Sequence, residues 1–155
     1  FSPDLSVPLS LPAGTIPSAY GCASTLATGA YLVNCSGQPL LQSPKWIIGG
    51  AVSQTIDIGN DARIVLDLRS RFESSRQTSE NFLAETRAGS NTRTDASVTY
   101  HSSDDTYSLA LYVNNIENKN VIAASFVNAL TPLFSFGTAT LRPPRTYGAR
   151  ASIKF

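Results

Sequence analysis

The sequence predicts an all-β protein of antiparallel strands, in the pattern of a transmembrane β-barrel segment. Three observations support this. Five segments of about ten residues alternate apolar side chains with polar or small ones, which is the period of a β-strand. The connections between them are alternately long and short. No stretch has a helical period, and no apolar run approaches the roughly 20 residues of a spanning helix.

Composition limits the classes of function. The 155 residues are enough for one domain with a sizeable core. Charged residues make up 15%, below the roughly 25% usual in soluble domains. A net charge of +1 gives no electrostatic reason to expect nucleic acid or a strongly acidic partner. The sequence contains no Met, so we expect Phe1 to follow a cleavage, either of a leader or of a larger precursor.

Residues 1–45 are rich in Pro, Ser and Gly. Apolar residues alternate from Leu5 to Leu11, but Pro8 interrupts them, so at best we expect an edge or loop strand there. The only two cysteines, Cys22 and Cys35, lie in a polar stretch with Gly and Ser. We expect them to form a loop disulfide rather than a zinc site, because zinc would need further Cys or His ligands. A disulfide implies an oxidising compartment.

The first two strands are predicted at 46–58 and 63–72, joined by a tight turn at Gly59-Asn60-Asp61. One face of the second strand is mainly apolar and the other carries Arg63, Asp67, Arg69 and Arg71. An Arg near the bilayer midplane costs about 2–4 kcal/mol, so we expect the charged face to line the barrel lumen. It would meet a plug or an anionic solute, or form a solvated wall without a ligand.

The other three strands are predicted at 94–100, 106–115 and about 145–155, with a second tight turn at 102–105. Leu109 and Leu111 share the apolar face of the fourth strand. In the last strand the alternation runs through Tyr147, Ala149, Ala151 and Ile153 to Phe155. Residues 73–91 and 116–142 are expected to be long connections, the first polar and the second irregular.

Strand and loop lengths both suit an outer-membrane barrel. Ten residues tilted by about 45° cross a bilayer, and such barrels alternate short periplasmic turns with long extracellular loops. The aromatic residues near the strand ends fit the aromatic girdles of such barrels; they are Trp46, Tyr100, Tyr107 and Tyr147.

The order and spacing of four pieces resemble the C-terminal barrel segment of TonB-dependent outer-membrane receptors. These are GQPLLQSPKW entering a strand, DLRSRFESS leaving one, YSLALYVNNIENKNV, and PPRTYGARASIKF at the end. The resemblance covers residues 36–155. It implies a 22-stranded antiparallel barrel with a plugged lumen, of which this chain would supply about five C-terminal strands. Residues 1–45 would then be an extracellular loop and 46–155 barrel strands and loops, with the plug domain absent from this chain.

The implied function is active transport of a scarce solute, such as a siderophore, a vitamin or a glycan, across the bacterial outer membrane. The implied partners are the remainder of the receptor as a separate or cleaved chain, TonB acting through the plug, the barrel-assembly machinery, and lipid or lipopolysaccharide. No nucleic acid and no cofactor are expected. In the last strand, Tyr147, Gly148, Ile153 and Phe155 would form the assembly signal.

Two further groups of residues have a possible chemistry. The run from His101 to Asp105 holds the residue types of a catalytic triad, but neighbours in a tight turn cannot orient one another in that way, and we expect no enzyme. Phe126, Phe134 and Phe136 in the last long connection would either stack on a ligand or pack that loop onto its neighbours. No metal-ligand cluster is evident.

Two other classes of protein remain possible. One is a small, self-contained outer-membrane barrel of about eight strands, an adhesin or structural protein, that uses residues 1–15 and 121–141 as extra strands. The other is a secreted β-sandwich binding module, which predicts solubility without detergent and a packed core between two sheets.

Overall fold

The structure, a computed structural model, describes residues 4–8, 21–27, 30–131 and 134–154. Within these ranges the regular elements are β-strands, apart from one 3₁₀ turn, η1 (Ala84–Thr86). The chain divides into two compact units, which are described separately. Unit 1 comprises residues 1–45, 75–89 and 121–141, and unit 2 comprises residues 46–74, 90–120 and 142–155.

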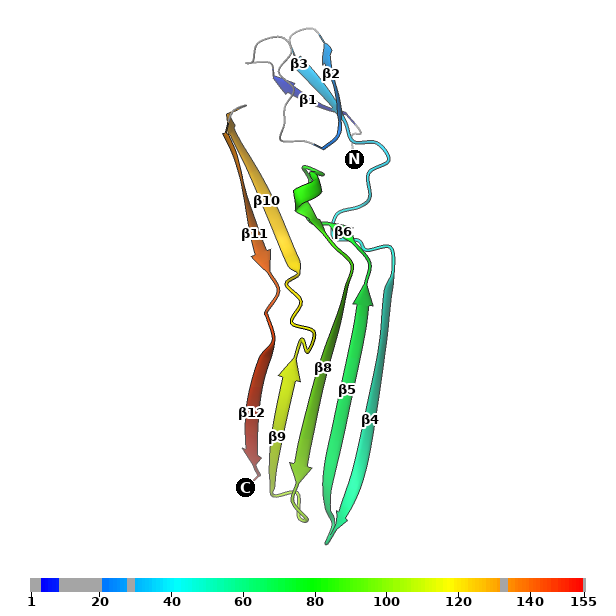
Figure 1. The fold of residues 1–155 in the computed structure, drawn as a ribbon, viewed down its shortest axis with the longest axis vertical. Coiled ribbons are helices and arrows are strands. Elements are labelled where there is room, and N and C mark those ends of the chain that lie inside the picture. Colours follow the sequence, from blue (N-terminus) through cyan, green and yellow to red (C-terminus); the bar gives the residue numbers. More distant parts are fainter. Residues whose placement is uncertain (1–3, 9–20, 28–29, 132–133, 155) are drawn as a thin grey trace. The chain divides into compact units, whose positions relative to one another are not determined.

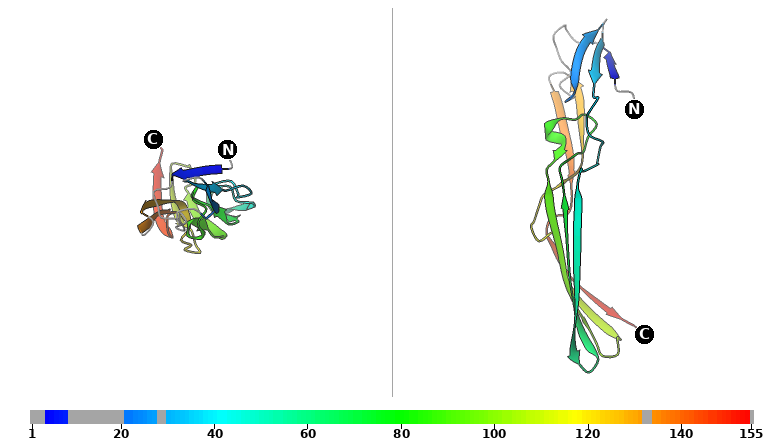
Figure 2. Two further views of the ribbon diagram at one scale, coloured as in Figure 1. Left: turned by 90° about the horizontal axis from the view of Figure 1, so that it is seen from above. Right: turned by 90° about the vertical axis from the view of Figure 1, so that its right-hand side faces the viewer.

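Unit 2 is one antiparallel sheet of five strands in the order β12-β9-β8-β5-β4 (Figure 1). The strands are β4 (Ile47–Gly59), β5 (Ala62–Glu73), β8 (Asn91–His101), β9 (Tyr107–Asn114) and β12 (Thr146–Ile153). They coincide with the five segments predicted from alternation, although β8 begins three residues earlier. The turned view shows β12 running at an angle to β4, as the twist of a sheet requires (Figure 2).

Both tight turns use residues that tolerate a left-handed backbone. Gly59, Asn60 and Asp61 have φ of 90°, 53° and 59° between β4 and β5, and Asp105 has φ of 53° between β8 and β9. Gly, Asn and Asp adopt this conformation at low cost, which is why these hairpins can close so tightly.

The register divides unit 2 into two faces of opposite character. One row of paired residues across the sheet is Ile56, Ile64, Tyr100, Leu109 and Ala151. A second row on the same side, four residues further along each strand, is Val52, Leu68, Ala96, Val113 and Tyr147. We call the face that carries these rows the apolar face. Among the described strands of unit 2, no charged residue lies on it. The opposite, polar face carries the Asp, Glu and Arg residues of the same strands.

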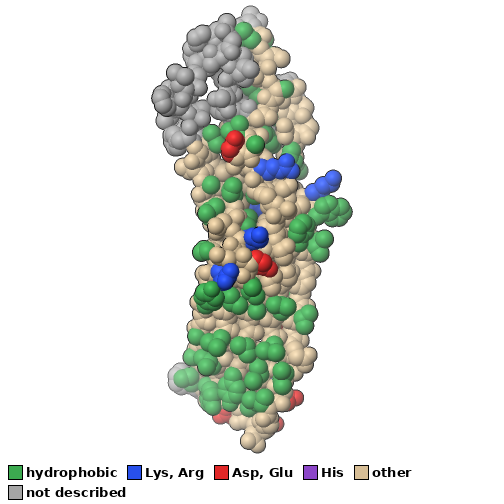
Figure 3. Space-filling view, viewed as in Figure 1, with side chains coloured by type: hydrophobic (Ala, Val, Ile, Leu, Met, Phe, Trp, Pro, Cys, Tyr) green, Lys and Arg blue, Asp and Glu red, His purple; other side chains and the backbone are tan. Residues whose placement is uncertain are grey.

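The apolar face is not covered. Val52, Leu68 and Leu111 are 68%, 49% and 53% exposed, values far from those of a packed core. In the space-filling view, hydrophobic side chains form a band across the strands of unit 2, with basic and acidic side chains above it and acidic ones at its lower edge (Figure 3). The antiparallel pairing of these strands confirms the prediction of an all-β antiparallel fold. The described strands of unit 2 form an open sheet and not a closed barrel.

Unit 1 contains two separate strand pairings. The strands β1 (Asp4–Pro8), β2 (Ala23–Ala27) and β3 (Ala30–Asn34) form a sheet in the order β1-β3-β2. The strand that ends at Pro8 lies at its edge, where Pro is tolerated. The strands β10 (Ile122–Thr131) and β11 (Phe134–Leu141) form a hairpin. The prediction of an irregular 116–142 segment is thus wrong for 122–131 and 134–141, where small residues such as Ala124 and Gly137 weaken the apolar alternation.

The connection between β5 and β8 is folded by polar contacts around β6 (Arg76–Gln77) and β7 (Arg87–Ala88). The Gln77 amide donates to the Leu83 carbonyl at 3.0 Å and to Thr86 Oγ1 at 2.6 Å. Arg76, which is 4% exposed, donates from Nε to Gln42 Oε1 at 2.9 Å. Because these buried groups are hydrogen-bonded, a polar stretch can be ordered without an apolar core of its own.

Cys22 and Cys35 form a disulfide bond, as the sequence predicted, with their Cα atoms 5.1 Å apart. Cys22 immediately precedes β2 and Cys35 immediately follows β3, whose end residues Ala23 and Asn34 are paired. The bridge therefore closes the open end of the β2–β3 hairpin.

We predict that neither cysteine reacts with an alkylating agent until the protein is reduced. By the chain-entropy model the bridge stabilises the hairpin by roughly 3 kcal/mol, so reduction should expose residues 21–35 to protease. Mass spectrometry of peptides alkylated with and without reductant measures both effects. Alkylation of the unreduced protein would contradict the prediction.

Candidate binding surface

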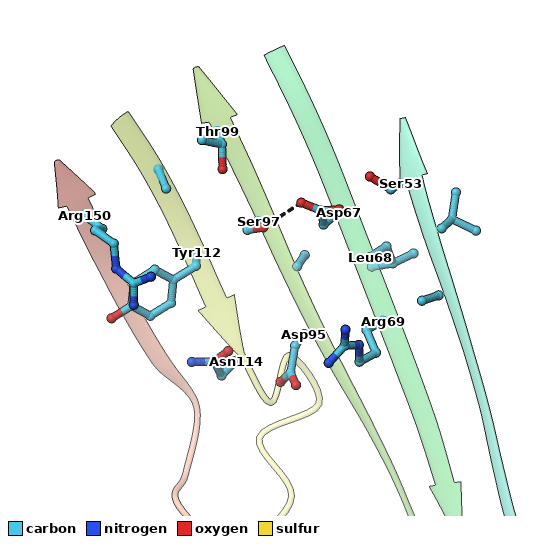
Figure 4. A pocket seen from close by; sticks show the side chains of 14 residues that line it. Ser53, Asp67, Leu68, Arg69, Asp95, Ser97, Thr99, Tyr112, Asn114 and Arg150 are labelled. Carbon is cyan, nitrogen blue, oxygen red and sulfur yellow. Dashed lines mark hydrogen bonds between the residues drawn. The ribbon is translucent and has the colours of Figure 1, made fainter. Parts of the chain in front are cut away.

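The polar face of unit 2 is hollowed between β4 and β12 (Figure 4). The hollow has a volume of about 830 Å³ and is open to the outside, and all five strands contribute to it. The polar side chains that line it are Ser53, Asp67, Arg69, Asp95, Ser97, Thr99, Tyr112, Asn114 and Arg150. These side chains lie on one side of the sheet because successive residues of a strand point to opposite faces, and each of them alternates with residues of the apolar face.

Charges of both signs are neighbours on this surface. Arg69 is paired in register with Asp95, and the Ser97 hydroxyl lies 3.5 Å from Asp67 Oδ2 (Figure 4). Asp95 Oδ1 accepts a hydrogen bond of 2.8 Å from the backbone N–H of Asn115 and lies 3.4 Å from Arg93 Nε. Such an arrangement offers donors and acceptors to a polar solute or a polar protein surface, with no single sign of charge dominating.

The residues predicted to face the lumen share the polar face but not one location. Asp67 and Arg69 line the hollow. Arg63 lies near the β8–β9 turn, where its guanidinium donates to both carboxylate oxygens of Asp105 at 2.8 and 3.0 Å. Arg71 is paired in register with Arg93. Strand parity places Asp95, Tyr112, Asn114 and Arg150 on the same face, although none of them was among the site residues predicted from the sequence.

Tyr112 and Gly148 are matched across β9 and β12. A β-carbon at position 148 would overlap the phenol ring of Tyr112, so the ring occupies the space that a side chain on β12 would need. An aromatic ring that covers a glycine on the neighbouring strand pins the register of the pair. The interlock fixes the last strand of the sheet in place.

The four residues predicted as an assembly signal do not share a face. Tyr147 and Ile153 lie on the apolar face and are 73% and 64% exposed. Gly148 lies on the polar face under Tyr112. Phe155 lies outside the described residues.

The β8–β9 turn uses its Ser, His and Asp side chains to close the backbone. Asp104 Oδ1 accepts hydrogen bonds from the N–H of Thr106 at 3.0 Å and from Ser102 Oγ at 2.8 Å. The hydrogen bonds from Thr106 and then Ser102 lower the pKa of Asp104 to about 2. The hydrogen bond from Arg63 lowers the pKa of Asp105, whose Oδ1 lies 3.4 Å from His101 Nδ1. These are the contacts of a turn former rather than of a nucleophile and its base.

The three aromatic candidates lie on the β10–β11 hairpin of unit 1. Phe126 is 58% exposed and is paired in register with Thr138. The side chains of Phe134 and Phe136 lie outside the described part of the structure, so a shared aromatic surface stays a prediction. Among the described residues, no group of three or more His, Cys, Asp or Glu side chains could hold a metal ion. No helix in that part of the chain is long and apolar enough to span a membrane.

Comparison of this chain with protein-family models, with curated proteins and with solved structures found no match in any of the three. The functional argument therefore depends on the chain's own geometry.

We predict that Gly148→Ala destabilises the folded protein by about 1 kcal/mol, because the new methyl group must displace the far end of the Tyr112 side chain. The same substitution in a Tyr112→Ala background should cost clearly less. Urea unfolding of the four proteins of this double-mutant cycle in detergent gives the coupling energy. Additive effects would show that the ring and the glycine do not interlock.

We predict that the β8–β9 turn loosens in strong acid. The pKa of Asp104 is depressed in the folded turn, so its contribution is fully present above the unfolded value of about 3.9 and is lost as the pH falls through about 2. The amide resonance of Thr106 should titrate with that midpoint, and Asp104→Asn should abolish the titration. A midpoint near 4 would contradict the hydrogen-bonding assignment.

Proposed function

We propose that this chain forms part of the wall of a TonB-dependent receptor, a bacterial outer-membrane transporter that takes up a scarce solute. One observation carries the proposal: five neighbouring strands present a continuous face without charge on one side and a charged, hydrogen-bonding face on the other. This is the pattern of strands that separate lipid from a polar lumen.

The apolar face is better suited to lipid than to water. Its leucine, isoleucine and valine side chains remain widely exposed, and patches of this extent on soluble proteins are normally covered. In contact with acyl chains they carry no such penalty. If the sheet were reversed, each Arg of the opposite face would cost about 2–4 kcal/mol at the bilayer midplane.

The height of the face fits a bilayer. Along β4 the apolar parity runs from Ile48 to Ile58. Ten residues at about 3.3 Å each span about 33 Å, which a tilt near 40° reduces to about 25 Å. The apolar band of outer-membrane barrels has about that height.

Both edges of the sheet favour further strands. Among the described strands, β4 pairs with β5 alone and β12 with β9 alone. An edge in lipid leaves backbone N–H and C=O groups unpaired at several kcal/mol each. Pairing with the remaining strands of a larger barrel, from the rest of the receptor, would satisfy both edges. A plug inside that barrel, pulled by TonB, would then meet the polar face.

The connections also fit the proposed orientation. The turns at one end of the sheet are short, at 59–61 and 102–105, and those at the other end lead into 75–89 and 121–141 (Figure 1). In the proposed receptor the short turns face the periplasm. Unit 1, with its disulfide, would belong to the extracellular loops, where the siderophore, vitamin, glycan or similar solute is captured.

The observed pairing gives less support to the other two classes. A small closed barrel needs residues 1–15 and 121–141 to extend the sheet, but β1 pairs with β3 and β10 pairs with β11. A sandwich needs a packed core, whereas the apolar residues of unit 2 are largely exposed.

We predict that Leu111→Arg lowers outer-membrane assembly far more than Ala110→Arg does. Leu111 lies on the apolar face and Ala110 beside it on the polar face, so the two variants introduce the same charge on opposite sides. Leu109→Arg and Ser108→Arg form a second matched pair. The measurement is the fraction of protein recovered from outer membranes in a heat-modifiable, folded form. Equal losses within each pair would refute the lipid-facing assignment.

Transport itself is tested with the complete receptor in cells with and without TonB. We expect energy-dependent uptake of one labelled probe from a panel of ferric siderophores, cobalamin and glycans. Arg69→Gln together with Asp95→Asn should leave assembly intact and reduce uptake, because both side chains line the polar hollow. Uptake that is independent of TonB would argue for a passive pore or an adhesin.

A further inference from the structure

Unit 1 gathers three stretches of chain that are far apart in sequence, residues 1–45, 75–89 and 121–141. The ladders of their described strands each stay within one stretch, so other contacts must hold the stretches together. We propose that the described parts of the three stretches open and close as one cooperative element, and that Arg76 is the positioning residue that couples them. The coupling concerns unit 1 alone, while its consequence for solute capture rests on the proposed function.

Arg76, in the second stretch, reaches into the other two at once. Its Nε donates to Gln42 Oε1 at 2.9 Å in the first stretch, and its Nη2 donates to the Ile122 carbonyl at 3.0 Å in the third. A guanidinium carries its donors in a fixed planar fork, so movement of one stretch strains the contact with the other. Because Arg76 is 4% exposed, a donor that loses its acceptor here is not readily compensated by water.

Three further contacts join the same stretches in pairs. The backbone N–H of Gln42 donates to the Gln77 carbonyl at 2.9 Å, which joins the first stretch to the second. Gln42 Nε2 donates to the Ala123 carbonyl at 3.1 Å, which joins the first to the third. The hydroxyls of Thr78 and Ser125 lie 2.6 Å apart and join the second to the third. Such a closed set of contacts favours joint opening, since no stretch can leave without breaking its contacts with both others.

The disulfide-bonded hairpin is tied to the same element. Gly21 donates its backbone N–H to the Asn81 carbonyl at 2.7 Å, and a β-carbon at position 21 would overlap the Phe82 carbonyl. Because Gly21 directly precedes Cys22, this close approach links the β2–β3 hairpin to the second stretch. In the proposed receptor, a solute that contacts one stretch would therefore shift the opening equilibrium of all three, which would not act as separate flaps.

The test is hydrogen exchange of the full chain folded in mild detergent, read at single amides. Arg76→Gln should speed exchange of the Gln42 amide and of the β10 amides about tenfold, while the β5 and β8 amides keep their protection. Arg87→Gln is the matched control on the neighbouring strand β7. Arg87 is exposed and donates to Ser75 Oγ, within its own stretch, at 2.9 Å, so its loss should change the same amides by less than about twofold.

Two further variants separate coupling from the burial of a charge. Arg76→Lys keeps the charge but replaces the fork with a single ammonium, so it should not restore the protection of Gln42 and of β10 together. Ser125→Ala should speed the Gln42 amide about threefold, although the structure shows no direct hydrogen bond between these two described residues. Ser36→Ala, the same change at an exposed residue, should leave that amide unchanged.

The coupling would be overturned by faster exchange confined to residues 75–78 in Arg76→Gln, by an equal effect of Arg87→Gln, or by full rescue with lysine. If Arg76→Gln does not fold, a Gln42 amide that does not respond to Ser125→Ala overturns it as well. A chain that shows the coupled exchange but is not recovered from outer membranes would remove the proposed function and leave the coupling in place.

Discussion

The rest of unit 2 depends on the period of two along its strands, combined with the register that aligns them. Neighbouring strands keep one register, apart from an irregularity between Asp57 and Gly59 at the end of β4, so the apolar parity of each strand falls on the same side. A slip of one residue would move charges such as Arg69 or Asp67 to that side. The polar hollow and the uncovered apolar face are therefore two consequences of one alignment. The interlock of Tyr112 with Gly148 and the tight turn before β5 stabilise this register.

Most of the sheet could be predicted from the sequence, because alternation is a local property that five segments show independently. The disulfide could also be predicted, from two isolated cysteines in a polar stretch. The hairpin of β10 and β11 could not, since small residues such as Ala124 and Gly137 weaken the pattern and only pairing reveals the strands. The buried contact of Arg76 with Gln42 was equally hidden, because the two residues are 34 positions apart in sequence. The contact of Gln77 with Thr86 is more local, but it depends on how the connection between β5 and β8 folds.

The candidate binding surface, too, could be predicted from the sequence only in part. Parity places Asp67 and Arg69 on the polar face, and on the neighbouring strands it places Asp95 and Arg150 there as well. It does not show that Arg63 is drawn to Asp105 by an ion pair, or that a glycine makes room for Tyr112. Such features need the register between strands, and the register follows from the whole sheet rather than from any one segment.

The border of the apolar face is stepped. On β4 and β5 apolar side chains continue up to Ile48 and Phe72, whereas on β8 they end at Ala96, below Thr94 and its hydrogen-bonded partner Glu117. On β8, β9 and β12 the last apolar residues lie in one row, Ala96, Val113 and Tyr147, so the border has a single step, between β5 and β8. Beyond that step Thr94 donates its backbone N–H and its hydroxyl to Glu117, so the position that would continue the apolar face on β8 is instead tied to the loop after β9.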